Sequence, residues 1–297
     1  MNPGKSGEPE GKDRMNRQKR IAAIHDISGF GKCSLTVALP ILSASGTEAC
    51  ALPTAVLSTH TGGLSGYTYR DLTEDLLPFA RHWKSLGLHF DALYSGFLGS
   101  YEQIDEVREI FRLLGDADTL LMVDPAMADN GALYRVYSDE MARGMTRLCA
   151  EADLIVPNMT EAAMLLGFSY REGPYTPGEI ERVLSDLCAM GPRQAVLTGV
   201  WFEPSRVGAA CYDRETKELH YAFSEKIGGM YHGTGDVFAS VLLAGLMRSL
   251  PLREAVELAV GFTRDAIERT YRAGTDVRFG VNFEECLPGL IRRLGLL

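Results

Sequence analysis

The sequence lacks the features that mark several large classes of protein. It has no basic excess, because 30 Lys and Arg residues stand against 39 Asp and Glu residues and the net charge is −9. No basic surface for nucleic acid is therefore expected. No apolar run approaches the 18 residues of a membrane span, and no signal peptide is recognisable. The six cysteines form no C-x-x-C pair, which predicts reduced thiols in a cytoplasmic protein without a zinc site.

Several catalytic motifs are also missing. There is no G-x-S-x-G elbow of a serine hydrolase and no H-x-x-x-H spacing for a metal. Gly31-Lys32 suggests a P-loop, but Asp26 stands where the first glycine belongs and Cys33 where Ser or Thr belongs. We therefore reject a P-loop. Cys33 beside Lys32 is read either as an activated thiol or as a small packing residue, and we favour packing.

What is present predicts one globular domain. Of the 297 residues, 46% are hydrophobic and 23% are charged. Residues 1–19 are polar and are expected to be a disordered tail, and residues 20–297 are expected to form a single domain. Apolar runs predict buried strands at 21–24, 48–57, 92–94, 120–123, 154–156 and 195–198, with a β-pair at 207–212 and 219–223. Helices are expected up to 43 and at 71–86, 103–114, 160–166, 178–190, 236–248, 252–271 and 283–294.

This alternation predicts an α/β fold with a mostly parallel central sheet and helices on both faces, a three-layer α/β/α arrangement. Ligands of such sheets bind beyond the carboxyl ends of the strands. The polar and glycine-rich segments fall at those ends. They are 25–34, 58–66 (which reads as a mobile flap), 95–96, 124–125, 158–161 and 198–199. We expect these segments to converge on one site.

The stretch 228–240 carries the strongest chemical signal. Its first half is glycine-rich and its second half, from Asp236, has the spacing of an amphipathic helix. Unpaired amides at a helix start, together with the helix dipole, form an anion site. Asp236 in the first turn is expected to be held ionised and able to accept a proton from a hydroxyl. This pair of features suits phosphoryl transfer to an alcohol. The plainer alternative is a glycine turn followed by an aspartate that favours the dipole.

Other acidic loops have two readings each. Asp124 and Asp129 follow a predicted strand and suit Mg²⁺ bound through water, but Asp124 before proline also suits a turn. Asn158 and Glu161 suit either a capping box or the orientation of Mg²⁺ on a phosphate. Asp26 or Ser28 of the first loop is a candidate for substrate contact. All of these residues are expected at the same sheet edge as Asp236.

Three segments, taken in order, carry a resemblance to a known superfamily. Asp124-Pro-Ala-Met, Asn158-Met-Thr-Glu161 and Gly233-Thr-Gly-Asp236 resemble the ribokinase-like superfamily of small-molecule kinases. Ser58-Thr-His-Thr-Gly62, Ser95-Gly-Phe-Leu-Gly-Ser100 and the segment 124–131 look like its pyridoxal (vitamin B6) kinase branch. The similarity runs from about residue 20 to 285.

The resemblance implies a ribokinase-like fold with a small β flap and ATP-dependent phosphorylation of the 5′-hydroxymethyl group of pyridoxal, pyridoxine or pyridoxamine. It implies Asp236 as general base and the amides of Gly233, Thr234 and Gly235 as the site for the transferring phosphoryl group. It also implies Mg²⁺ with Asp124 and Glu161, a K⁺ ion near the phosphates, and a homodimer. The implied substrate contacts are Asp26, Ser28, Thr54, Thr61, Gly62, Phe97 and Asp236, and the implied ATP contacts are Asp124, Asn158, Glu161, Thr198, Gly233 and Gly235.

The sequence departs from the branch at two places. Asp26 occupies the position of a ring-contacting serine, so Ser28 is the alternative contact. Asp129 follows Ala128 where glycine is usual. A hydroxymethylpyrimidine or other small-alcohol kinase of the same fold is the alternative function, followed by a non-catalytic vitamer-binding protein.

Overall fold

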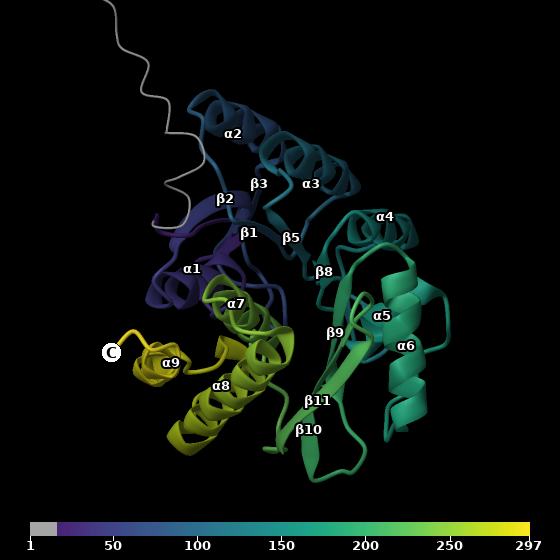
Figure 1. The fold of residues 1–297 in the computed structure, drawn as a ribbon. Helices are drawn as coiled ribbons and strands as arrows, with labels where there is room; N and C mark the ends of the chain where they lie inside the picture. The colour runs from purple at the N-terminus through teal and green to yellow at the C-terminus, as the bar shows by residue number, and fades with distance from the viewer. Residues whose placement is uncertain (1–16) are drawn as a thin grey trace, which may run out of the picture.

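The computed structural model describes residues 17–297 and confirms the three-layer α/β/α prediction (Figure 1). The sheet has nine strands in the order β11-β10-β9-β8-β5-β4-β1-β2-β3. The central strands pair in parallel, while β10 runs antiparallel to β9 and β11, and β3 runs antiparallel to β2. The strands are β1 Arg20–Ser28, β2 Glu48–Leu57, β3 Tyr69–Asp71, β4 Ala92–Ser95, β5 Leu120–Val123, β8 Leu154–Ile155, β9 Gln194–Val200, β10 Arg206–Asp213 and β11 Glu218–Glu225.

Two hydrophobic cores lie on opposite faces of the sheet. One is covered by α2 Thr73–Ser85, α3 Tyr101–Leu114, α4 Asp139–Ala150, α5 Met159–Leu166 and α6 Pro177–Ala189. The other is covered by α1 Leu35–Ala44, α7 Thr234–Met247, α8 Leu252–Ala273 and α9 Leu287–Arg293. Helices on both faces are the expected cover for a parallel sheet, and they leave the carboxyl ends of the strands free to form a site.

The structure corrects the predicted character of α7. Its spacing predicted an amphipathic helix, but every residue from Val237 to Gly245 is buried. The helix lies between the sheet, α1 and α8 and therefore has no solvent face over this stretch. Because α7 is buried on all sides, its first turn is held firmly at the edge of the sheet.

Three elements were absent from the prediction or placed differently. Helix α4 was missed, although Ser138 accepts a hydrogen bond from the Met141 amide as its N-cap. The short hairpin of β6 Ala128–Asp129 and β7 Ala132–Leu133 turns at Asn130 and Gly131, both with positive φ, as an Asn-Gly turn requires. The expected helix 283–294 is instead a 3₁₀ turn, Glu284–Cys286, followed by α9.

The flap and the tail need separate description. Residues 58–68 contain no strand, and the β-structure of the flap is the β2–β3 pairing at its base, from Ala55↔Asp71 to Leu57↔Tyr69. The predicted tail lies largely outside the described residues, and its disorder stays a prediction. Its last residues contact the domain, since Arg17 and Lys19 form ion pairs with Asp91 at 2.9 and 3.0 Å. In the part of the chain that the structure describes, no helix is both long and apolar enough to cross a membrane.

Candidate active site

A cavity of about 390 Å³ opens at the carboxyl edge of the sheet. It brings together a group of predicted residues from four separate segments of the chain. That group comprises Asp124, Asn158, Glu161, Thr198, Gly233, Thr234, Gly235 and Asp236. The convergence predicted for the acidic loops and the glycine loop is therefore confirmed.

The glycine loop fits its place only because Gly233 has no side chain. Gly233 is the N-cap of α7 with φ of +75°, in the left-handed region that favours glycine. A Cβ at this position would overlap the carbonyl oxygen of Lys32, so the loop lies directly on the first loop. Helix geometry leaves the amides of residues 234–236 without an intrahelical acceptor. These amides and the positive end of α7 give the cavity a site for an anion.

Asp236 lies in the first turn of α7 and is half-buried. Burial raises its pKa to about 7, with the charge of Asp26 adding to the effect and a hydrogen bond from the Ser34 amide opposing it. The expectation that the helix start holds this carboxylate ionised is thus corrected, because burial outweighs the dipole. A pKa near neutrality suits a group that must accept a proton in one step and release it later.

Asp124 and Glu161 form an acidic cluster with Asp236. Burial, followed by the charge of Asp236, raises the pKa of Asp124 well above its usual range. Burial and the charge of Asp124 do the same for the pKa of Glu161. Because the charge of Asp236 acts on Asp124 and that of Asp124 acts on Glu161, the cavity is short of positive charge. A cation bound between them would relieve this.

Glu161 also has a structural role. Its carboxylate accepts hydrogen bonds from the amides of Asn158 at 2.8 Å and Met127 at 3.1 Å, while the Asn158 side chain accepts from the Glu161 amide at 3.0 Å. This is the capping box of α5. The capping-box alternative is therefore confirmed, and the same bonds hold the 127–128 segment against the start of α5. A role with Mg²⁺ stays a prediction.

The donor set fits Mg²⁺ better than a metal that needs a protein cage. Among residues 17–297, no three His, Cys, Asp or Glu side chains are grouped closely enough to enclose an ion. Mg²⁺ keeps several waters and binds through one or two carboxylates together with substrate phosphates. Asp124 is a buried carboxylate beside Asp236, and its role with Mg²⁺ stays a prediction.

The first loop joins the predicted acceptor residues to Asp236 through Ser34, a residue that the sequence reasoning missed. The Ser28 hydroxyl donates to Asp26 at 2.9 Å, and the Ser34 side chain also hydrogen bonds with Asp26. The amide of the same Ser34 donates to Asp236. Ser34 therefore bridges two acids, one on β1 and one on α7. Only its position just before a predicted helix could have signalled it.

The other predicted acceptor residues lie around the first loop and the flap. The buried Thr54 hydroxyl donates to the carbonyl of Phe97 at 3.4 Å, and the Phe97 ring packs edge-on against Tyr137. Thr61 and Gly62 are half-buried, and the Gly62 amide donates to Nδ1 of His60 at 3.0 Å. These residues do not line the 390 Å³ cavity. Their contact with a substrate stays a prediction.

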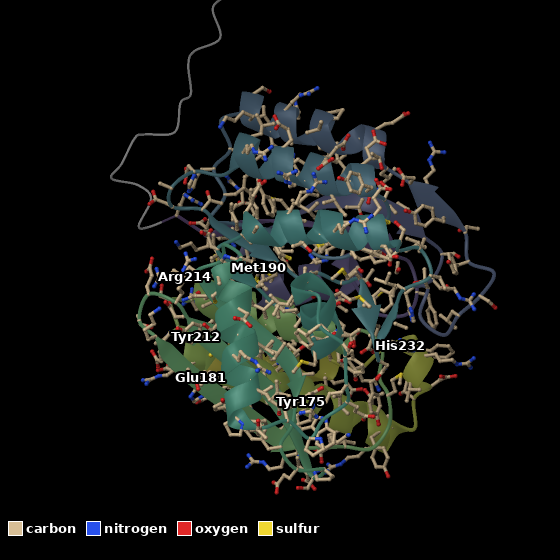
Figure 2. The ribbon with its side chains drawn as sticks, turned by 90° about the vertical axis from the view of Figure 1, so that its right-hand side faces the viewer. Tyr175, Glu181, Met190, Tyr212, Arg214 and His232 are labelled. Atoms are coloured by element: carbon tan, nitrogen blue, oxygen red, sulfur yellow. The ribbon has the colours of Figure 1, made fainter. Side chains whose placement is uncertain are left out.

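His232 connects the flap with the glycine loop. Its ring centroid lies 5.3 Å from that of His60, and it lines the cavity. Burial lowers the pKa of His232, and so does the charge of His60. Figure 2 shows that His232 lies away from α6, the helix that carries Glu181 and is followed by Met190.

The far wall of the cavity was also missed. It is built from β10, the end of β11, the loop from β11 to α7 and one face of α8. The apolar residues of this wall are Val207, Ile227, Met230, Tyr231, Val260 and Ile267. An apolar wall opposite an anion site suits a flat base at one end of the cavity and phosphates at the other.

The structure supports both the rejection of a P-loop at Lys32 and the interpretation of Cys33 as a packing residue. The ammonium of Lys32 contacts Asn282 and Glu284 at 3.1 and 2.9 Å. Burial raises the pKa of the Cys33 thiol, and the nearby carboxylates of Asp236 and Asp26 raise it further. Such a thiol is protonated at neutral pH and is not an activated nucleophile.

Comparison with known proteins agrees with this geometry. A model of the phosphomethylpyrimidine kinase family matches residues 39–280. A pyridoxal kinase structure from Lactobacillus plantarum is 32% identical, with a TM-score of 0.84 over 93% of this chain and 97% of that one. A Bacteroides thetaiotaomicron protein designated a phosphomethylpyrimidine kinase, in a crystal form with pyridoxal, is 37% identical, with a TM-score of 0.88 over 92% and 96%. The pyridoxal kinase PdxY of Histophilus somni is 27% identical over 86% of this chain and 91% of its own length.

The fold and the site define a small-molecule phosphotransferase with the ribokinase-like fold. The chain belongs to the phosphomethylpyrimidine kinase family. The region that matches the family model, 242 of the 297 residues, covers most of the chain.

Proposed function

We propose that this enzyme transfers the γ-phosphoryl group of ATP to the 5′-hydroxymethyl group of pyridoxal, pyridoxine or pyridoxamine. The observation that carries the proposal is the position of Asp236. It lies in the first turn of α7, has a pKa of about 7, and is linked through Ser34 to the buried Asp26 of the first loop. An acceptor alcohol between Asp236 and the amides at the start of α7 would have its base on one side and the phosphoryl site on the other.

In the proposed reaction Asp236 accepts the proton of the acceptor hydroxyl. The oxygen forms a bond to the γ-phosphorus, and the bond from that phosphorus to the β–γ bridging oxygen breaks, releasing ADP. The amides at the start of α7 stabilise the charge on the transferring group. Asp236 then releases its proton to solvent, which its near-neutral pKa permits.

Asp124 would hold Mg²⁺, and Glu161 would support it from the capping box of α5. When bound, Mg²⁺ neutralises charge on the phosphates. The burial of Asp124 beside Asp236 supports this role, because burial and the charge of Asp236 disfavour the ionised form of Asp124 and a bound cation would offset that effect. A K⁺ ion near the phosphates is part of the same proposal.

The vitamer pocket is proposed at the first loop, below the flap. Asp26 and Ser28 would contact the pyridine ring, with Thr54 and Phe97 nearby and Thr61-Gly62 closing from the flap. Relatives support this acceptor class, because the Bacteroides protein is described with pyridoxal and the Lactobacillus and Histophilus proteins are pyridoxal kinases. Closure of the flap would exclude water, which would otherwise compete as the acceptor.

A hydroxymethylpyrimidine acceptor is the second candidate, favoured by the description of the matching family. Both acceptors carry a hydroxymethyl group on a six-membered nitrogen heterocycle, so the base and the phosphoryl site would be used in the same way. Polar contacts around the ring must discriminate between them.

A test would measure ADP release with pyridoxal, pyridoxine, pyridoxamine and hydroxymethylpyrimidine, each alone and in competition. The proposal expects the highest kcat/KM with a B6 vitamer and a product heavier by one phosphoryl group in mass spectrometry. A preference for hydroxymethylpyrimidine would establish the second candidate. Binding of a vitamer without ADP release would establish the non-catalytic alternative. We further propose a cytoplasmic homodimer, which sedimentation analysis would test.

A further inference from the structure

The segment 276–284, between α8 and α9, touches all three loops around the proposed acceptor site. We call it the C-terminal strap. It contains the 3₁₀ turn Val277–Phe279, the buried Gly280 and Val281, and then Asn282, Phe283 and Glu284. Its sequence has no helical or strand period, and its conformation therefore depends on the contacts that it makes.

The strap grips the first loop at three points. The Lys32 ammonium contacts the Asn282 side chain at 3.1 Å and Glu284 at 2.9 Å. The rings of Phe30 and Phe279 pack edge to face at 5.0 Å between centroids. Gly280, with φ of +85°, lies so close that a Cβ there would be 2.7 Å from the Cβ of Lys32. The Asn282 side chain is itself fixed, since its Nδ2 donates to the Thr275 hydroxyl at 2.9 Å.

The strap also contacts the flap and the glycine loop. Nε2 of His60 donates to the carbonyl of Arg278 at 2.6 Å, while its Nδ1 accepts from Gly62. The amide of His232 donates to the carbonyl of Val277 in a long bond of 3.5 Å. The Arg278 guanidinium forms an ion pair with Asp276. The hydrogen bond to the flap is made by the backbone carbonyl of Arg278.

The first loop has a conformation that needs such support. Lys32 and Ser34 have φ of +44° and +51°, values that side chains other than glycine rarely adopt. Backbone strain of this kind persists only where the surroundings enforce it. This conformation lays the carbonyl oxygen of Lys32 against Gly233, where an added Cβ would lie 2.2 Å from it, and it places the Ser34 amide beside Asp236.

We propose that Lys32 is a positioning residue whose anchorage to Asn282 and Glu284 keeps the strained first loop in the shape that supports the start of α7 and orients Asp236. The lysine that imitates a P-loop in the sequence thus acts through the backbone and not on phosphate. This proposal rests on the proposed role of Asp236 as the base. It also assigns the strap a role in catalysis although the strap does not line the cavity.

The test compares Lys32→Met, Lys32→Arg and Glu284→Lys with the wild-type enzyme at saturating Mg²⁺. We expect Lys32→Met to lower kcat about tenfold, the effect of one lost hydrogen bond to a charged group, while KM for ATP changes less than twofold. Lys32→Arg keeps the ion pair and should restore most of kcat. Glu284→Lys repels Lys32 without entering the cavity and should lower kcat in the same way. Lys84→Met, on the exposed end of α2, is the control and should leave kcat unchanged.

The double variant Lys32→Met, Glu284→Lys should have the kcat of Lys32→Met alone, because both changes remove one anchorage. A loss of kcat in the double variant equal to the product of the two single losses would overturn the proposal. So would a KM for ATP raised more than fivefold by Lys32→Met with kcat retained, since Lys32 would then bind phosphate. If Lys32→Met does not fold, Glu284→Lys alone decides, and an unchanged kcat overturns the proposal. If the wild type turns over and neither the Lys32 variants nor Glu284→Lys changes kcat, only this inference is refuted. If the wild type shows no turnover with any acceptor, this inference and the proposed function are refuted together.

Discussion

Replacing Asp236 by asparagine removes the carboxylate and keeps the shape of the side chain. Because asparagine cannot accept the hydroxyl proton, kcat should fall by a factor on the order of 10² to 10⁴. The wild-type enzyme should itself lose kcat/KM as the pH falls below about 7, approaching tenfold per pH unit, since protonated Asp236 cannot act as the base. The Asn variant should show no such limb in its residual activity.

The same substitution should stabilise the fold at alkaline pH. The carboxyl has a pKa of 3.8 without the fold and about 7 within it, so the folded state disfavours the charged form. At 1.36 kcal/mol per pKa unit the cost is at most about 4 kcal/mol. The cost is full above pH 7, shrinks as the pH falls from 7 to about 3.8, and is absent below. Asparagine carries no such cost, so its advantage in free energy of unfolding should be large at pH 8 and small at pH 5.

Urea unfolding at both pH values and ADP release at pH 8 measure these two effects. Glu181→Gln is the matched control, since it neutralises an exposed carboxylate on α6 that does not line the cavity. It should leave kcat within threefold of the wild type. If Asp236→Asn keeps turnover within threefold, Asp236 is not the base. If it gains no stability at pH 8, burial does not raise the pKa of Asp236, and the explanation of its near-neutral value is wrong.

Three further predictions concern the same edge of the sheet. Gly233→Ala should lose at least about 2 kcal/mol in chemical denaturation and most of kcat, because φ is +75° and a Cβ overlaps Lys32; Gly235→Ala, whose Cβ meets open space, should keep its stability, and equal losses would disprove the reasoning. Glu161→Gln should cost about 1–2 kcal/mol in the same measurement because one capping acceptor is lost, and should also raise the Mg²⁺ requirement; an unchanged unfolding midpoint would contradict the capping role. Asp124→Asn should raise the Mg²⁺ concentration for half-maximal rate severalfold, and an identical Mg²⁺ titration would exclude Asp124 as a ligand.

Much of the fold could be predicted because its signals are local. The strand Glu48–Leu57 has the predicted bounds, and the alternation of buried runs with helices gave the layers. Helix α4 was missed although its signal was present. Met141, Met145 and Leu148 have helical spacing and Ser138 is a typical N-cap, so both the helix and its start have a local signal. The Asn-Gly hairpin was a second unused local signal.

The site divides in the same way between local and distant causes. The glycine loop and the acids after the strands are local motifs, and the prediction that they meet followed from the topology of a parallel sheet. Ser34 could not be predicted because its role depends on backbone angles that strain the loop, and those angles depend on contacts with residues about 250 positions away in sequence. The pKa of Asp236 had the same limit, since burial on all sides of α7 reversed an expectation based on the helix dipole alone.

The most direct test of the central claim is the rate of ATP-dependent product formation with each B6 vitamer, measured with the wild-type enzyme and with Asp236→Asn in parallel. We expect a phosphorylated vitamer and an equal amount of ADP from the wild type, and a loss of at least about 10² in kcat for the variant. A wild-type enzyme that forms no phosphorylated vitamer, or a variant that forms it at the wild-type rate, would contradict the account.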